Sequence, residues 1–283
     1  MASSLPLELR GTVAVLTGAG SGIGAALAPM LAQRGAHLAL VDVNGAALEA
    51  TAVQARAHGV TVTTHVFDLA QPESVPALFD AVLAAHGRAS VLINNAGVAL
   101  GGSFSQVAAA DFDWLMSINF GAVVNLTRAF LPLLVREPVA QIVNLSSIFG
   151  IVAPPGQTAY CAAKFAVRGF SESLRHELQM AGSSVGVTVV HPGGVRTRIA
   201  ESARVAAGLS AAEIALRKQA AQRLLVMPPE EAAARILLAI ERRELRVLVG
   251  KDAVGAAWLQ RLFPVTYWKH MGRSIARRVQ RAD

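Results

Sequence analysis

VAVLTGAGSGIGAALAPMLAQRGAHLALVDV, residues 13–43, contains the clearest pattern of secondary structure in the sequence. Its apolar start (13–18) is typical of a buried strand, its alanine-rich middle (21–36) of a helix, and its end (38–43) of a second buried strand. Glycines mark the junction between the first strand and the helix. Because parallel neighbours need a long crossover between them, this order predicts a β-α-β unit with two parallel strands.

The same alternation of strands and helices continues along the chain. The strands are apolar over nearly their whole length, which is typical of a parallel sheet covered on both faces. We therefore expect an α/β fold, a doubly wound parallel sheet with helices on both faces. The pattern predicts further helices near 45–58, 72–87, 111–134 and 158–181, and further strands at 62–69, 90–97, 141–147, 186–194 and 245–250.

Three regions differ in composition. Residues 1–250 show no internal repeat or low-complexity linker, so we expect them to form a single domain. This length is within the range of one large α/β domain. Within it, the alanine-rich stretch at about 198–227 predicts an inserted helical lid. Residues 251–283 follow the last predicted strand and form a basic, amphipathic C-terminal extension.

The positive charge of the chain belongs to its C-terminal part. The net charge is +7, yet residues 1–234 contain 15 basic and 15 acidic residues, and residues 235–283 contain 11 basic and 4 acidic ones. The charge of the main domain therefore gives no reason to expect a nucleic-acid groove there, and we expect no nucleic-acid partner. Two interpretations of the extension stay open: a helix on an anionic membrane surface, or a helix packed on protein. Both rest on an apolar stripe of Trp268, Met271, Ile275 and Val279 beside a basic stripe of Lys269, Arg273, Arg277 and Arg281.

Cysteine and histidine usage excludes some kinds of site. Cys161 is the one cysteine, so an intramolecular disulfide is excluded, which suits a reducing compartment. No Cys/His cluster has zinc-binding spacing, so we expect no metal. The N-terminus lacks the basic-then-apolar pattern of a signal peptide, and we expect a cytoplasmic protein, with membrane association open through the extension.

The turn TGAGSGIG (17–24) predicts a dinucleotide site, because it follows a strand and opens a helix. Gly18 allows the tight turn, Gly22 lets backbone approach a phosphate, and Gly24 lets the helix pack closely on the strand. Asp42 ends the second strand, where a carboxylate can accept hydrogen bonds from ribose hydroxyls and would repel a 2′-phosphate. This favours NAD over NADP. Asp68 follows the third strand, where it fits either an adenine contact or an ordinary turn.

A tyrosine and a lysine lie four positions apart in TAYCAAK (158–164). On a helix, Tyr160 and Lys164 would share one face. A positive charge beside a phenol lowers its pKa, which makes the phenol useful as an acid or base.

Taken together, the motifs resemble those of the short-chain dehydrogenase/reductase family over roughly residues 10–250. They are TGAGSGIG, NNAG (94–97), SIN (117–119), NLSSIFG (144–150), YCAAK (160–164) and HPGGVRT (191–197). The resemblance implies a Rossmann-type fold and an oxidoreductase. It implies that Tyr160 is the general acid/base, that Ser147 binds the substrate oxygen, that Lys164 lowers the pKa of the tyrosine, and that Asn119 anchors a proton-relay water. Ser146 is then a structural hydroxyl.

The same resemblance implies the cofactor site. Tyr160 and Lys164 belong to it, and Thr197 would bond the nicotinamide carboxamide. Asn95, Ala96 and Gly97 fit either a passage beneath the adenosine or a structural turn. The full implied set is Gly18, Ser21, Gly22, Ile23, Gly24, Asp42, Asp68, Leu69, Asn95, Ala96, Gly97, Tyr160, Lys164, Pro192, Gly193, Val195 and Thr197.

The substrate side is mostly apolar in sequence, and its candidate pocket residues are Leu100, Ser147, Phe149, Val152, Gln157 and Gly194. We expect hydride transfer between NAD(H) and a hydrophobic secondary alcohol or its ketone. Two alternatives stay open: an NADPH-dependent 3-oxoacyl or carbonyl reductase, and a non-catalytic dinucleotide sensor or scaffold. The resemblance also implies a homodimer or homotetramer formed through the helices near 111–134 and 158–181.

Overall fold

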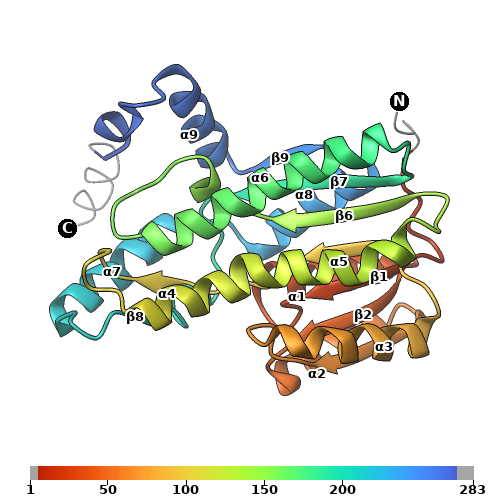
Figure 1. Cartoon of the computed structure of the whole chain (residues 1–283). Coiled ribbons are helices and arrows are strands. Elements are labelled where there is room, and N and C mark those ends of the chain that lie inside the picture. The colour runs from red at the N-terminus through yellow and green to blue at the C-terminus, as the bar shows by residue number, and fades with distance from the viewer. Residues whose placement is uncertain (1–5, 273–283) are drawn as a thin grey trace.

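The computed structural model of the chain describes residues 6–272. Its centre is a seven-stranded, parallel sheet with the strand order β3-β2-β1-β4-β6-β7-β9. This order is that of a Rossmann-type sheet, so the predicted fold class is confirmed (Figure 1). The strands are β1 (Val13–Thr17), β2 (His37–Asp42), β3 (Val62–Val66), β4 (Val91–Asn94), β6 (Ala140–Leu145), β7 (Val185–Pro192) and β9 (Arg246–Val249).

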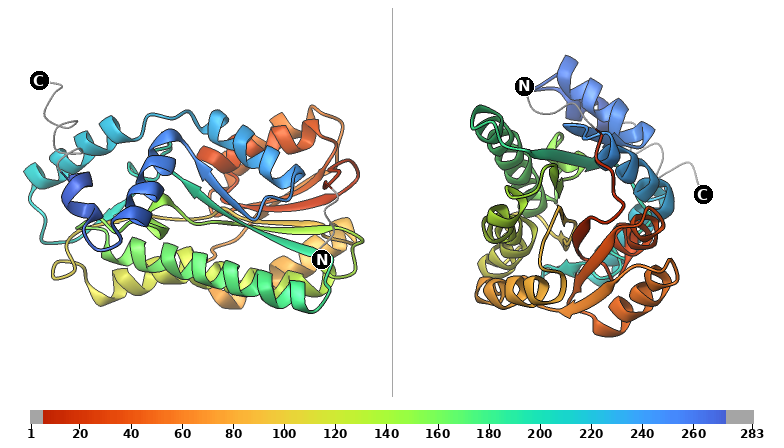
Figure 2. Two further views of the ribbon diagram at one scale, coloured as in Figure 1. Left: turned by 90° about the horizontal axis from the view of Figure 1, so that it is seen from above. Right: turned by 90° about the vertical axis from the view of Figure 1, so that its right-hand side faces the viewer.

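Helices cover both faces of the sheet, as the end-on view in Figure 2 shows. One face packs against α1 (Gly22–Gln33), α2 (Gly45–Arg56) and α8 (Pro229–Glu241). The other packs against α3 (Val75–His86), α5 (Ala122–Leu134) and α6 (Thr158–Met180). A single sheet thus separates two hydrophobic cores, which is why its strands carry apolar side chains on both sides.

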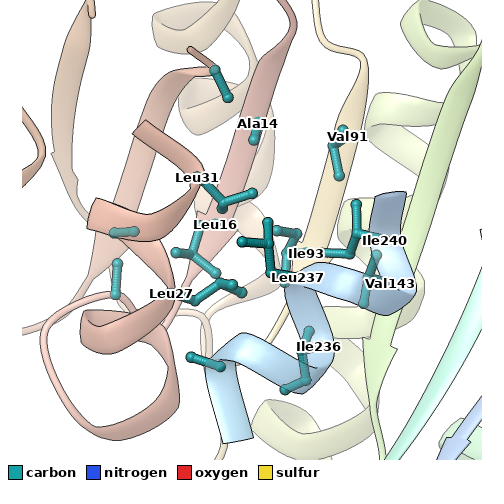
Figure 3. Packing of buried hydrophobic residues seen from close by; sticks show 14 of the residues in the cluster. Ala14, Leu16, Leu27, Leu31, Val91, Ile93, Val143, Ile236, Leu237 and Ile240 are labelled. Atoms are coloured by element: carbon teal, nitrogen blue, oxygen red, sulfur yellow. The ribbon is translucent and has the colours of Figure 1, made fainter. Parts of the chain in front are cut away.

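The core between the sheet, α1 and α8 is shown in Figure 3. Leu27 and Leu31 of α1 and Ile236 of α8 lie over β1 and β4 and are fully buried. On the opposite face, the rings of Phe79 in α3 and Phe130 in α5 meet edge to face, with 5.3 Å between their centroids. The helices packed on both faces therefore hold the sheet in place, and the loops at its carboxyl edge start from fixed positions.

Several elements differ from those predicted. The third strand ends at Val66 rather than at residue 69, because the backbone turns at Asp68. The predicted helix at 111–134 is α4 (Ala109–Met116), a π-helical turn (Ser117–Gly121) and α5. The helix α8 has no counterpart among the predicted elements. Two 3₁₀ turns, Pro72–Ser74 and Ile148–Gly150, precede α3 and α6.

Residues beyond the carboxyl edge form a second layer of structure over the sheet ends. The short strands β5 (Leu100–Gly101) and β8 (Arg204–Val205) pair in parallel, and α7 (Ala211–Leu224) lies within the predicted lid at 198–227. The guanidinium of Arg204 stacks 3.6 Å from the ring centroid of Trp114, which fastens β8 to α4. After β9, α9 (Lys251–Leu262) begins the predicted extension; residues 273–283, which hold most of its basic stripe, lie outside the described residues.

Within the described residues, one helical stretch, Ala109–Leu134, is long and apolar enough to cross a membrane by length and composition. Half of its most apolar window is buried inside the fold, where α5 packs on the sheet. Such burial is typical of a core helix.

We expect that truncating Leu31 to alanine lowers the free energy of unfolding by about 2–5 kcal/mol, because its fully buried side chain would leave a cavity under the sheet. Leu216→Ala is the matched control, since that leucine in α7 is 59% exposed and should change stability by less than about 0.5 kcal/mol. Urea denaturation of both variants measures this, and equal losses would contradict the packing in Figure 3.

Candidate active site

A cavity of about 1790 Å³ opens where the strands end. Ligands bind at this edge in doubly wound sheets, because the loops that follow the parallel strands gather there. Most of the predicted cofactor residues line it: Gly18, Ser21, Gly22, Ile23, Asp42, Asp68, Leu69, Asn95, Ala96, Gly97, Tyr160, Lys164, Pro192, Gly193, Val195 and Thr197. So do the predicted substrate residues Leu100, Ser147, Phe149, Gln157 and Gly194. The volume exceeds that of a typical single-ligand pocket, so there is room for a dinucleotide and a second molecule.

The turn after β1 leaves no room for a side chain at its glycines. Gly18 has a φ of +65°, and a Cβ there would lie 2.8 Å from Cα of Ala96. A Cβ on Gly24 would overlap the carbonyl oxygen of Gly18, although Gly24 itself does not line the cavity. Gly22 has a φ of +54° and faces Thr197. These glycines form a bare backbone cradle at the N-terminus of α1, where amide groups can bind a pyrophosphate.

Asn95 ties this turn to the end of β4. Its side-chain amide donates to the carbonyl oxygens of Thr17 and Gly18, at 2.9 and 3.1 Å. In return, the hydroxyl of Thr17 accepts from the backbone amides of Asn95 and Ala96 at 3.0 and 3.1 Å. Asn95 therefore holds the glycine turn against the end of β4 and also lines the cavity. Thr17 contributes to the same contact, and the sequence analysis did not predict this role.

The two acidic residues at the rim differ in their contacts. The carboxylate of Asp42 accepts from the backbone amides of Gly20 and Asn44, both at 2.9 Å, so it is held beside the glycine turn. Asp68 accepts from the amide of Ala70 at 2.9 Å, which is the turn contact expected of an aspartate after a strand. Both line the cavity.

The first turns of α6 bring Tyr160 and Lys164 to the cavity, as their spacing predicted. The ammonium of Lys164 lies 5.7 Å from the ring centroid of Tyr160 and donates to the carbonyl oxygen of Leu145 at 2.9 Å. Ser147 begins the 3₁₀ turn, and its hydroxyl accepts from the amide of Phe149 at 3.1 Å. The hydroxyl of Ser146 donates instead to the carbonyl oxygen of Lys164 at 2.8 Å, a structural contact.

Burial is the largest cause of the pKa shifts of Tyr160 and Lys164. It raises the pKa of Tyr160 to about 12, and the hydroxyl of Ser147 opposes that rise. Burial also lowers the pKa of Lys164 to about 8, because the side chain is only 3% exposed. The sequence analysis expected the lysine to lower the pKa of the phenol. In the structure, burial of the phenol is the largest cause and raises this pKa instead.

Asn119 does not line the cavity. It is fully buried in the π-helical turn, where its side chain accepts from the amide of Val98 at 2.8 Å and donates to the carbonyl of Val98 at 2.9 Å. The extra residue of a π turn breaks the regular helical hydrogen bonding, and such turns are frequent at functional sites. Asn119 thus fixes the loop after Gly97 to the helix that flanks Lys164, and its Oδ1 would lie 3.3 Å from a Cβ on Gly97.

The turn after β7 is braced from two sides. His191 is fully buried, and its Nδ1 donates to the carbonyl oxygen of Ser147 at 2.9 Å. Burial lowers the pKa of His191 to about 4, so the ring is neutral at pH 7. From the other side, the carboxylate of Asp252 accepts from the amide of Gly194 at 2.7 Å. Neither residue was a predicted site residue, because each acts through a contact distant in sequence.

The prediction that Val152 belongs to the pocket is wrong. The 3₁₀ turn at Ile148–Gly150 carries the chain back on itself, with the amide of Val152 donating to Ile148 at 2.9 Å. The Val152 side chain is fully buried as a result and does not line the cavity.

Comparisons with known proteins identify the family of the chain. A model of the short-chain dehydrogenase family matches residues 12–207. The putative oxidoreductase SadH of Mycobacterium tuberculosis is 42% identical over 270 residues, which are 95% of this chain and 97% of that protein.

Similar solved structures include complexes with NAD and with NADPH. A short-chain dehydrogenase/reductase from Burkholderia phymatum in complex with NAD has a TM-score of 0.84 and 34% identity, over 90% of this chain and 95% of that one. A short-chain dehydrogenase from Sphingobium yanoikuyae in complex with NADPH has a TM-score of 0.74 and 31% identity, over 92% and 95%. Sequence and fold agree: the chain belongs to the short-chain dehydrogenase/reductase family and is an oxidoreductase of that family.

Proposed function

We propose that the protein transfers hydride between NAD(H) and a hydrophobic secondary alcohol or its ketone, with Tyr160 as general acid/base. The observation that carries this proposal is the meeting of Ser147, Tyr160 and Lys164 on a cavity that also reaches the glycine turn. A protein that only binds a dinucleotide has no need of a serine, a tyrosine and a lysine gathered beyond the cofactor cradle.

The cradle fits a dinucleotide. The bare backbone of Gly18 and Gly22 suits a pyrophosphate, and the carboxylate of Asp42 suits ribose hydroxyls. A 2′-phosphate would place a second negative group beside Asp42, which supports NAD over NADP. When bound, the dinucleotide supplies or accepts the hydride, while the protein orients it and excludes water.

The protein's own residues would manage the proton. Tyr160 is protonated at neutral pH, so it can donate a proton to a ketone oxygen. When the reaction runs toward the ketone, Tyr160 must first lose its proton, and the phenolate then accepts the proton of the alcohol. The hydroxyl of Ser147 would donate to the same oxygen and stabilise charge that develops there. Lys164, held by Leu145, brings a positive charge near the phenol. The side chain of Asn119 bonds Val98 with both of its polar groups, so if Asn119 anchors a proton-relay water it would do so through its backbone.

The apolar walls support a hydrophobic substrate. Phe149 packs edge to face on Tyr160, with 6.1 Å between the ring centroids. Leu100 lines the cavity beside them, and α7 adds Ile214 and Leu224 from the stretch proposed as a lid. Apolar surface around a few polar groups is typical of a site for an apolar molecule with one reactive oxygen. A homodimer or homotetramer through α4, α5 and α6, and a cytoplasmic location, stay predictions.

The first test is replacement of Tyr160 by phenylalanine. We expect NAD-coupled oxidation of secondary alcohols from butan-2-ol to dodecan-2-ol to fall by about 10²–10⁴, since the proton acceptor is lost. Cofactor binding, followed by NADH fluorescence, should stay within about threefold because the cradle is untouched. Turnover equal to that of the wild type would contradict the role of Tyr160.

A second test compares NADH and NADPH binding to the wild type and to Asp42→Ala. We expect NADH to bind the wild type at least about tenfold more tightly, because Asp42 repels the 2′-phosphate. The variant should lose most of this preference. Tighter NADPH binding by the wild type would instead favour the NADPH-dependent reductase alternative.

A third test uses the lowered pKa of Lys164. Between pH 8 and about 10.4 the lysine is neutral in the folded protein but protonated in the unfolded chain. The unfolded state then binds more protons, so stability rises with pH. We expect the free energy of unfolding, wild type minus Lys164→Met, to rise on the order of 2 kcal/mol from pH 8 to 10 and to be flat below pH 7. Urea denaturation across this range checks it, and a flat difference throughout would contradict the lowered pKa.

A further inference from the structure

The C-terminal segment Lys251–Met271 forms one side of the cavity. It consists of α9 and the turn and helical residues that follow it. Leu259, Trp268 and Met271 line the cavity, as do Ile214 and Leu224 of α7. Figure 1 shows α9 at the carboxyl edge of the sheet, the same end at which α7 lies. The described part of the apolar stripe seen in the sequence therefore faces a cavity, and the fold itself accounts for Trp268 and Met271.

One anchor of this segment is Asp252, in the first turn of α9. Its carboxylate accepts from the amide of Gly194 at 2.7 Å, on the turn that follows β7. A Cβ on Gly193 or on Gly250 would overlap this carboxylate, so both glycines make room for it. The contact joins the start of the C-terminal segment to the cofactor side of the site.

The other anchor is Tyr267. Its hydroxyl accepts from the amide of Ala153 at 2.9 Å, on the loop that follows Ser147. The rings of Phe263 and His270, one on each side of Tyr267 in the sequence, pack with 4.9 Å between their centroids and fold the segment back on itself. Trp268 follows Tyr267 directly, so this anchor holds the backbone that carries the indole, and the indole itself lines the cavity.

We propose that Lys251–Met271 is a substrate-selecting wall of the active site, in which Trp268 contacts the part of a long apolar substrate that lies away from the reacting carbon. The proposal rests on the proposed function, and it adds the substrate class: secondary alcohols or ketones with an extended apolar chain. Asp252 and Tyr267 are positioning residues. Asp252 holds the wall against the turn after β7, and Tyr267 holds it against the loop after Ser147.

The large apolar area of the indole is the reason why Trp268 would favour substrates with a long apolar chain. A tryptophan side chain buries more apolar surface than most others, and each buried methylene of a substrate gains free energy in the same way. A contact with the non-reacting chain stabilises the ground state and the transition state alike, so it should appear in KM while kcat changes little. In this proposal a short alcohol does not reach the wall, so its kcat/KM does not depend on Trp268.

The test compares Trp268→Ala with the wild type on butan-2-ol and dodecan-2-ol at saturating NAD. We expect kcat/KM for the long alcohol to fall at least about tenfold, through KM, and that for the short alcohol to stay within about twofold. Trp268→Phe keeps much of the apolar area and should restore most of the long-chain preference. Equal losses on both alcohols with both variants would overturn the proposal, because they would indicate general disruption.

Trp258→Ala is the matched control. This tryptophan lies in the same segment, but it is 59% exposed, stacks with Arg261 at 6.0 Å and does not line the cavity. Its removal should leave the ratio of long-chain to short-chain kcat/KM unchanged within about twofold. A loss of long-chain preference equal to that of Trp268→Ala would place the effect in the segment's stability and overturn the role of Trp268.

A binding measurement distinguishes failure of the substrate-selecting wall from failure of the proposed reaction. Calorimetry with dodecan-2-one and butan-2-one, on Tyr160→Phe protein saturated with NADH, needs no turnover. We expect the long ketone to bind at least about tenfold more tightly, and the added Trp268→Ala change to remove most of that difference. If the wild type turns over no alcohol but this difference appears, the wall stands and the proposed reaction fails. If the long ketone binds no better than the short one, the wall fails whatever the turnover shows.

Discussion

The close contact between the first glycine turn and the end of β4 is the constraint on which the site depends. The Cα of Ala96 lies so near Gly18 that only a residue without Cβ fits, and Asn95 and Thr17 lock the two backbones with reciprocal hydrogen bonds. A parallel sheet brings its loops to one edge, but it does not by itself set their spacing. This contact does so, and it leaves a cavity between the cradle and α6.

Local patterns in the sequence were enough for the fold and for much of the cavity lining. Tyr160 and Lys164 face the cavity because a four-residue spacing fixes one side of a helix, whatever lies around it. The glycines of the first turn were found because a βα junction has a narrow range of geometries. Where the outcome depended on contacts distant in the chain, local patterns failed: Val152 turns inward, Asn119 lies in a π turn, and Asp252 reaches a glycine far upstream.

The pKa of Tyr160 shows a second limit of local reasoning. A lysine four residues away suggests a lowered phenol pKa, and the pair is indeed close. Yet both groups leave water together, and each then favours its neutral form, which raises one pKa and lowers the other. The sign of such a shift follows from the balance between attraction and desolvation, and burial is not visible in a heptapeptide.

The position of Trp268 and Met271 on the cavity also has a consequence for how the protein is made. Chains emerge from the ribosome N-terminus first, so the glycine turn and Tyr160 are available long before the residues that close this side of the cavity. Closing this side of the cavity is therefore a late step, which follows the synthesis of the residues that bind the dinucleotide and of Tyr160.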